Sequence, residues 1–412
     1  MPSFFIPLSG LQANSNALSV TANNLANLST IGYKSQRPLF EDLFYQQVGT
    51  SGDGNPEQLG VGASIQAVDS QFTQGSIQST GVPTDVAIQG NGYFILDNAG
   101  ERLYTRAGDF SVSSDGNLLS KDGASVLGYP AVNGVVNPNA TLGPLQLATG
   151  QTNPPNPTAN VQLTMNLDSG TAVNGTFSTP VTVYDSLGAA HVLTYNFTKT
   201  AANTWNYAIT IPAADVGATG NPVTIKTGTL SFNGSGQLTA PAANVAGIAA
   251  TGLADGASNL TFAWNLYDPT GAGVVSQVAG PSAVSTTGQD GFSSGTLVSY
   301  IISSDGTIQG TFSNGQTSAL GQIALASFQN DQGLVRNGAN EFLSSLASGQ
   351  ANLGAPGTGG RGTVSGGALE QSNVDIATQF AQLILQERGY QANAKAVTTF
   401  DEVTQTAINL KQ

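Results

Sequence analysis

The sequence predicts a multidomain α+β protein. Long N- and C-terminal helices are expected to form a coiled-coil layer, and two mainly-β domains of barrel or sandwich type are expected between them, the outer one inserted in the inner one. Three observations lead to this prediction. Apolar side chains recur at alternating steps of four and three at both ends of the chain, tight-turn dipeptides separate short alternating stretches between them, and the charge content changes in the middle.

Residues 1–28 are expected to form the first helix, with its apolar side chains in one stripe. No charged residue precedes Lys34, so the rest of this helix is polar but uncharged. Ordering each residue costs about 1.5 kcal/mol, whereas each buried apolar side chain returns about 2 kcal/mol, and only a handful lie in the stripe. The helix is therefore expected to become ordered only against partners. The stripe comprises Leu8, Leu11, Leu18, Ala22 and Leu25.

Residues 368–412 are expected to hold a second, longer helix, because no proline follows Ser372. Ser372 or Asn373 is expected as its N-cap, with Asp375 in the first turn, where a carboxylate interacts favourably with the helix dipole. Gly389 is expected to weaken the helix by about 1 kcal/mol. Two stripes suggest helices that pair with each other and with neighbouring copies; an ordinary helical hairpin is the alternative. The second stripe comprises Ile376, Phe380, Leu383, Tyr390, Ala394 and Val397, with Leu410 in a shifted phase near the end.

The inner β domain is expected at residues 71–150 and 290–353. Val86–Leu96 is interpreted as two short strands around a Gly-Asn-Gly turn, and Asp115-Gly116 is typical of a hairpin turn. Residues 354–367, which contain seven glycines, are expected to lead the chain back to the terminal helix.

The outer domain is expected at residues 151–289, as an insertion in the inner one. A proline-rich stretch, Gln151–Pro157, marks its start. The domain has no Arg and no Glu, and only Lys199 and Lys226 accompany its five Asp residues. Evenly spaced alternating stretches favour a sandwich or a barrel. The clearest of these are Val181–Tyr184, Val192–Phe197, Trp205–Ile211 and Leu260–Leu266.

Composition excludes several classes of function. The net charge of −13 argues against binding to nucleic acid or to an anionic membrane surface. No apolar run is long enough for membrane insertion, and the absence of cysteine excludes disulfides and thiol chemistry. The N-terminus has no basic region, and Pro7 interrupts its short apolar run, so a cleaved signal peptide is not expected.

Catalytic and metal sites are not expected either. The one histidine, His191, lies in a predicted strand and is expected at the surface or in a hairpin. One histidine without cysteine leaves no typical zinc or transition-metal cluster, and no nucleophile elbow accompanies it. The chain is therefore expected not to be an enzyme and to need no cofactor. Four acidic residues beside turns could bind calcium, although turn formation explains them without an ion: Asp115, Asp122, Asp305 and Asp331.

Both ends of the chain carry motifs that resemble the signatures of flagellar rod and hook proteins. They are Leu8–Ala13, Ala22–Asn27 and Thr30–Lys34 at the N-terminus, and Ser372–Asp375 and Arg388–Lys395 at the C-terminus. The motifs occur in the family's order, with Glu387 where glutamine is usual and Gln379 where an acid is common. The signature residues are Asn24, Asn27, Gly32, Tyr33, Lys34, Asn373, Asp375, Arg388, Gln391, Asn393 and Lys395.

The resemblance implies a structural protein that forms a homopolymer. Its implied partners are flagellar rod proteins, hook–filament junction proteins, the hook cap and the type III export apparatus, and its implied location is extracellular, in the bacterial flagellum. It implies a connector at residues 29–70 and 354–367. It also places Arg106 and Phe110 at matching positions of the first β domain, with Arg106 as a structural or intersubunit salt-bridge donor.

The large insert favours a hook-type subunit over the generally shorter rod relatives. Such a subunit builds a curved tube that acts as a universal joint and transmits torque from rod to filament. A distal-rod or hook-like paralogue is the first alternative. An alternative from another class is a secreted β-sandwich carbohydrate-binding protein or glycosidase that shares only the helical ends.

Overall fold

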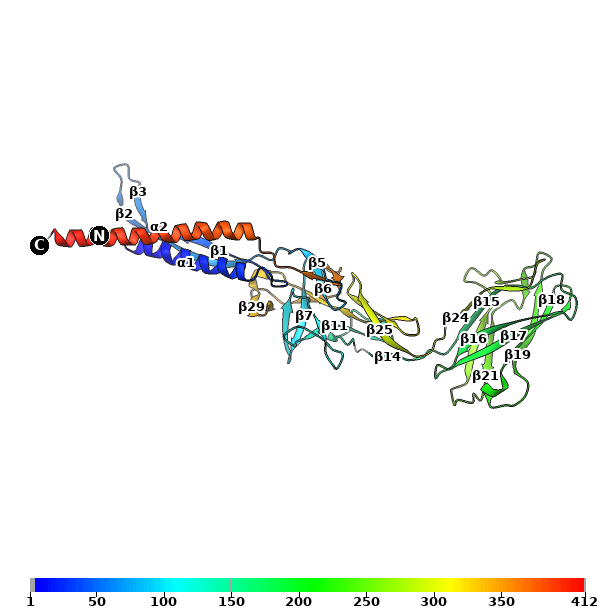
Figure 1. Ribbon diagram of the computed structural model, residues 1–412. Coiled ribbons are helices and arrows are strands. Elements are labelled where there is room, and N and C mark those ends of the chain that lie inside the picture. The colour runs from blue at the N-terminus through cyan, green and yellow to red at the C-terminus, as the bar shows by residue number, and fades with distance from the viewer. Residues whose placement is uncertain (1–3, 148–149, 411–412) are drawn as a thin grey trace. The chain divides into compact units, whose positions relative to one another are not determined.

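The computed structural model describes residues 4–147 and 150–410, which divide into two compact units (Figure 1). The first unit comprises Met1–Thr149, Ser299–Gly310 and Thr317–Gln412, and the second comprises Gly150–Val298 and Thr311–Gln316. The parts of the predicted ranges at 1–3, 148–149 and 411–412 lie outside the described residues.

The first unit contains two antiparallel terminal helices, α1 (Phe5–Ala26) and α2 (Ile376–Asn409), which lie side by side (Figure 1). Asn24 near the end of α1 contacts Gln379 near the start of α2. The N-cap of α2 is Asp375 itself, whose carboxylate accepts a hydrogen bond from the Thr378 N–H at 2.6 Å. The expected N-caps, Ser372 and Asn373, are therefore wrong, since the helix starts later.

Residues 29–70 form strands and not only a connector. β1 (Gln36–Asp42) pairs antiparallel with β4 (Ala63–Ser70), and both strands contact α1. Between them, β2 (Tyr45–Thr50) and β3 (Pro56–Gly60) form a second antiparallel pair.

The β body of the first unit is built on the strand path β27-β11-β7-β8-β30-β29. The predicted pair around Gly90 and Gly92 is present as β6 and β7. The predicted connector at 354–367 contains β32, which pairs with β6. Strand bounds are β5 Ile77–Ser79, β6 Val86–Gln89, β7 Tyr93–Asn98, β8 Glu101–Thr105, β9 Ser111–Val112, β10 Leu118–Leu119, β11 Ser125–Val132, β12 Val135–Val136, β13 Gly143–Pro144, β27 Thr317–Ile323, β28 Leu325–Ser327, β29 Val335–Gly338, β30 Glu341–Leu343, β31 Asn352–Gly354, β32 Thr363–Gly366 and β33 Ala368–Glu370, with a short 3₁₀ turn at Asp331–Gly333.

The second unit is a β-sandwich of two five-stranded sheets. One sheet has the order β16-β17-β18-β19-β20, and the other has β21-β22-β15-β23 with β24 also paired to β15. Side chains from both sheets form one core, in which Trp264 packs edge-on against Tyr195 with ring centres 5.2 Å apart. The bounds are β14 Thr152–Asn153, β15 Asn160–Asn166, β16 Thr176–Tyr184, β17 Ala190–Ala201, β18 Thr204–Ile211, η1 Ala213–Val216, β19 Val223–Phe232, β20 Leu238–Ala240, β21 Val245–Ala250, β22 Leu260–Asn265, β23 Val275–Ser276 and β24 Ala283–Gln289.

The strands β25 (Gly295–Ile302) and β26 (Thr307–Phe312) contain residues of both units. Within residues 4–147 and 150–410, neither helix combines enough length and hydropathy to span a membrane.

Candidate assembly site

The two terminal helices contact each other through small and polar side chains. Thr21 donates a hydrogen bond of 2.8 Å to the Gln386 side chain, and Asn24 donates one of 3.0 Å to the Gln379 side chain. Gly389 permits a close approach, because a Cβ there would lie 2.7 Å from the Asn14 amide oxygen. Gly389, which was expected only to weaken α2, therefore also allows α2 to pack closely against α1.

The predicted apolar stripes do not form this contact, and no member of either stripe is buried. Leu8 is 54% exposed and Phe380 is 52% exposed, far more than such side chains are in a protein core. Within one chain, the hydrogen bonds between the helices lie on the polar faces next to the stripes, and the pairing of the stripes stays a prediction. Exposed are Leu8, Ala22, Ile376, Phe380, Tyr390 and Leu410; half-buried are Leu11, Leu18, Leu25, Leu383, Ala394 and Val397.

Further exposed apolar side chains extend this surface beyond the predicted stripes. Ile384 and Leu385 are exposed on α2, and Phe5 is exposed on α1. On the β2–β3 hairpin and its flanks, Phe44 is 91% exposed and Tyr45 is also exposed. The sequence analysis did not identify this surface, although the aromatic cluster of Phe40, Phe44 and Tyr45 is a signal that could have indicated it. So many exposed large apolar side chains on the helices and this hairpin indicate an interaction surface.

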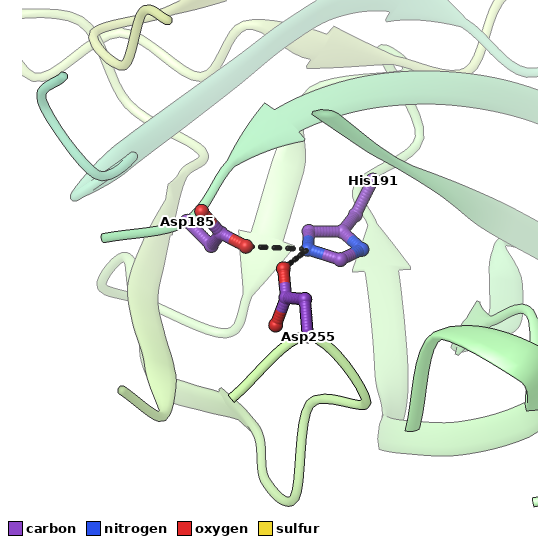
Figure 2. Close-up of side chains that lie close together, drawn as sticks. All are labelled: Asp185, His191 and Asp255. Atoms are coloured by element: carbon purple, nitrogen blue, oxygen red, sulfur yellow. Dashed lines mark hydrogen bonds and ion pairs between the residues drawn. The ribbon is translucent and has the colours of Figure 1, made fainter. Parts of the chain in front are cut away.

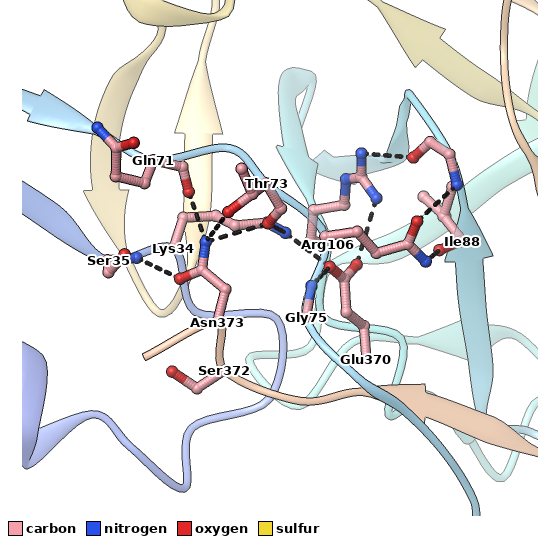
Figure 3. Close-up of polar contacts among 12 residues, drawn as sticks. Lys34, Ser35, Gln71, Thr73, Gly75, Ile88, Arg106, Glu370, Ser372 and Asn373 are labelled. Carbon is pink, nitrogen blue, oxygen red and sulfur yellow. Dashed lines mark hydrogen bonds and ion pairs between the residues drawn. The ribbon is translucent and has the colours of Figure 1, made fainter. Parts of the chain in front are cut away.

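A buried ion-pair network joins the segments next to the helices to the β body of the first unit (Figure 3). The Lys34 ammonium lies 2.6 Å from one oxygen of Glu370, and the Arg106 guanidinium lies 3.2 Å from the other. Arg106 also donates a hydrogen bond of 2.8 Å to the Gly90 carbonyl. Arg106 is thus a structural salt-bridge donor within the chain. Glu370 was missed in the sequence, where a single acid before the helix has no distinctive pattern.

Burial shifts the pKa of Lys34 in this network. The Lys34 and Glu370 side chains have no exposed surface. Burial lowers the pKa of Lys34, and the adjacent Glu370 carboxylate offsets only part of that effect. Glu370 also accepts a hydrogen bond from the Gly75 N–H at 2.9 Å, so several segments depend on one carboxylate.

Asn373 joins three segments instead of capping α2 (Figure 3). Its amide oxygen accepts a hydrogen bond from the Ser35 N–H at 2.7 Å. Its NH₂ group donates to the carbonyls of Gln71 and Thr73, at 2.7 and 3.0 Å. Asn373 therefore holds the chain before α2 against both ends of the β1–β4 hairpin.

Other signature residues also have structural contacts. Asn24 exchanges two hydrogen bonds with the backbone of Gln36, at 2.7 and 2.9 Å. Gly32 has a φ of 69°, and a Cβ there would lie 2.6 Å from the Ala107 nitrogen. Tyr33 is buried and donates to Asn24 at 3.2 Å. Asn27 donates to the Asn23 carbonyl at 2.9 Å and Asn393 to the Gly389 carbonyl at 2.8 Å, whereas Arg388, Gln391 and Lys395 are exposed on α2.

In the second unit, one expectation from the sequence is met in one of its two alternatives. His191 lies in a strand of the β16–β17 hairpin, as expected, but the residue is only 6% exposed and is therefore not at the surface. The ring is enclosed because Asp185, which follows β16, and Asp215, which lies in η1, hydrogen-bond to its two nitrogens at 3.0 Å each.

Four known sequence families match the chain. Residues 7–34 match "Flagella basal body rod protein" and residues 365–410 match "Flagellar basal body rod FlgEFG protein C-terminal". Residues 87–184 match "Flagellar hook protein FlgE/F/G D1 domain", and residues 147–292 match "Flagellar basal body protein FlaE D2 domain". The matches cover both helical ends and the β-rich middle.

Whole proteins show the same similarity. The chain is 35% identical to flagellar hook protein FlgE of Escherichia coli (strain K12), over 98% of each chain. It is 33% identical to flagellar hook protein FlgE of Treponema pallidum (strain Nichols), over 100% of each chain. The crystal structure of Helicobacter pylori flagellar hook protein FlgE2 covers 71% of this chain with a TM-score of 0.55 and 16% identity, which shows a shared fold.

Proposed function

Because the chain belongs to the flagellar hook protein FlgE family and is a structural subunit of the flagellar hook, we propose that it polymerises through its terminal helices into the curved hook tube. The tube acts as a universal joint that transmits torque from the rod to the filament. The role is mechanical and not catalytic.

The observation that carries this proposal is the exposed apolar surface of the helix pair. The helices bury polar side chains such as Thr21 and Gln386 against each other and leave Phe380 and Leu8 in solvent. Burying one such large side chain stabilises a contact by about 1.5–3 kcal/mol. Repeated along both helices, these side chains supply a contact between subunits that the chain itself leaves unfilled.

In this proposal each part of the chain has a place in the polymer. Residues 1–28 and 368–412 of neighbouring copies form the coiled-coil layer, and residues 29–70 and 354–367 connect it outward. Residues 71–150 and 290–353 form the inner β domain, with residues 151–289 inserted as the outer one.

The proposal extends to location and partners. The subunit is exported by the type III apparatus without a cleaved signal peptide and assembles outside the cell under the hook cap. It then meets the rod at one end of the hook and the junction proteins at the other. The alignments support a hook subunit over a distal-rod paralogue or a secreted sugar-binding β-sandwich, because they extend through the insert as well as both ends.

The test places a charge in the second stripe. Phe380→Glu changes a side chain that is exposed in the chain, so the subunit keeps its fold, whereas the carboxylate would be buried between copies at a cost of several kcal/mol. Electron microscopy of the purified variant is expected to show no tubes. Ala202→Glu, in an exposed turn of the second unit, is the matched control. Equal assembly of the two variants would contradict the proposal.

A further inference from the structure

His191 and three carboxylates form a compact cluster in the second unit. The ring Nε2 lies 3.0 Å from an oxygen of Asp185 and 3.9 Å from an oxygen of Asp255, and Figure 2 shows both carboxylates directed at this one nitrogen. The ring Nδ1 lies 3.0 Å from an oxygen of Asp215. Asp185 is fully buried, while Asp255 is 33% exposed, so the cluster opens to solvent on one side.

The four residues come from both sheets of the sandwich. Asp185 follows β16, His191 lies in β17 and Asp215 lies in η1, which all belong to one sheet and its connections. Asp255 lies in the loop between β21 and β22 of the other sheet. That loop is held beside the cluster by a hydrogen bond of 2.9 Å from the Ala254 N–H to the Asp215 carbonyl.

The orientation of the donors is fixed by further contacts. One oxygen of Asp185 accepts hydrogen bonds from the backbone N–H groups of Leu187 and Ala189, at 2.8 and 2.9 Å, so the other oxygen faces the ring. Asp215 holds Nδ1, which leaves Nε2 to face Asp185 and Asp255. A carboxylate on one imidazole nitrogen that directs the other toward a metal ion is a recurrent arrangement in metalloproteins.

The charge of the cluster calls for a cation. Residues 151–289 contain no arginine and only Lys199 and Lys226, and among the described residues neither lysine forms an ion pair with these carboxylates. A neutral imidazole surrounded by three carboxylates would leave uncompensated negative charge beside the buried Asp185, which is costly. Both ring nitrogens face carboxylate oxygens, so the positive charge comes either from a second proton on the ring or from a metal ion that replaces that proton at Nε2.

We propose that Asp185, His191 and Asp255 bind a divalent transition-metal ion of the zinc class, with Asp215 as a positioning residue. One imidazole nitrogen and two carboxylate oxygens form a donor set that suits Zn²⁺, and imidazole argues against Mg²⁺ or Ca²⁺. The three donor atoms lie within 4.8 Å of one another. Donors around a tetrahedral zinc ion with bonds of about 2.0–2.1 Å lie about 3.3 Å apart, so a small movement of the partly exposed Asp255 completes the site.

This site revises the expectation that a single histidine excludes a metal cluster. Its acids are separated from His191 along the sequence and meet only in the folded sandwich. A bound ion would cross-link the loop that carries Asp255 to the β16–β17 hairpin and so join the two sheets at one end of the outer unit. The site is independent of the assembly surface on the helices.

Zinc titration of the full-length chain tests the proposal. After treatment with a chelator and its removal, isothermal titration calorimetry with Zn²⁺ at neutral pH is expected to show one ion bound per chain. Zn²⁺ is also expected to raise the unfolding temperature of the chain. Co²⁺ as a probe is expected to give visible absorption bands of a nitrogen- and oxygen-ligated ion.

Asp255→Asn is the decisive variant, because its partly exposed side chain can change without unfolding the sandwich. We expect at least a tenfold loss of zinc affinity and no thermal shift with Zn²⁺. Asp215→Asn is expected to weaken binding by about 10–100-fold and to alter the Co²⁺ spectrum. Asp268→Asn, in an exposed turn of the same unit, is the control and is expected to bind as the wild type does. Absence of stoichiometric binding, or equal affinity of wild type and Asp255→Asn, would overturn the proposal.

Discussion

The Lys34 ammonium and the Glu370 carboxylate form an ion pair of 2.6 Å in which neither side chain has exposed surface. Lys34 follows the end of α1, and Glu370 ends the strand before α2. The pair therefore fastens together the two segments through which the helices join the β body.

Removal of the Glu370 charge is expected to destabilise the first unit strongly. In Glu370→Gln, the buried Lys34 and Arg106 lose their shared counter-ion, and breaking such a pair costs about 3–5 kcal/mol. Chemical denaturation followed by circular dichroism would measure the loss. Glu101→Gln, in an exposed position of β8, is the control and is expected to change stability by less than about 0.5 kcal/mol. Equal stabilities of the two variants would contradict the role given to the network.

Gly32→Ala is expected to destabilise the same region for a steric reason. A φ of 69° disfavours any residue with a Cβ, and this Cβ would lie 2.6 Å from a backbone nitrogen that cannot rotate away. We expect the free energy of unfolding, measured by thermal denaturation, to fall by at least about 1–2 kcal/mol. Gly52→Ala, where a Cβ meets no atom within 4 Å, is the matched control. If Gly32→Ala were as stable as the wild type, the backbone around residue 32 would be able to move away from Ala107.

Acid is expected to weaken the second unit through Asp290. Partial burial raises the pKa of Asp290, but hydrogen bonds from Asn160 and Ala159, at 2.8–2.9 Å, outweigh it and leave the pKa below its usual range. The pKa of Asp290 is lower in the folded state than in the unfolded state. Its contribution to stability is therefore fully present when the pH is above the unfolded-state pKa of about 3.9, and it is lost as the pH falls through the folded-state pKa.

The measurement is the difference in unfolding temperature between wild type and Asp290→Asn. We expect the wild type to be more stable at pH 7 and the difference to shrink below about pH 4. A difference that stays constant down to pH 2 would show that Asp290 does not titrate as proposed.

Deletion of residues 158–289 tests the mechanical role of the insert. The flanking residues Asn156 and Phe292 already exchange backbone hydrogen bonds of 2.9 and 3.0 Å, so a short linker can close the gap. We expect tubes to form with altered curvature or stiffness, and motility to suffer. Electron microscopy and swimming assays would measure this. Complete loss of tubes would instead make the insert essential for assembly, and unchanged curvature and swimming would make it mechanically idle.

The sequence predicted the terminal helices and the sandwich because periodicity and turn residues are local signals. It did not identify the faces on which the helices pair. The side chains that pair there, such as Thr21 and Gln386, are polar, and hydrophobic periodicity does not detect them. Contacts between segments that are distant in the sequence could not be predicted either. Glu370 contacts Lys34, and Asp255 approaches His191, only after the chain has folded.

The hydrogen bonds between α1 and α2 also determine how the helix pair responds to force. A contact of interchangeable leucines could slip by one helical turn, about 5.4 Å, and find an equivalent packing. Slippage here would separate the buried amides of Gln379 and Gln386 from Asn24 and Thr21, and loss of a hydrogen-bond partner is costly for a buried polar group. The two helices therefore resist creep under axial load and behave as a single strut, so that deformation is left to the surfaces between subunits.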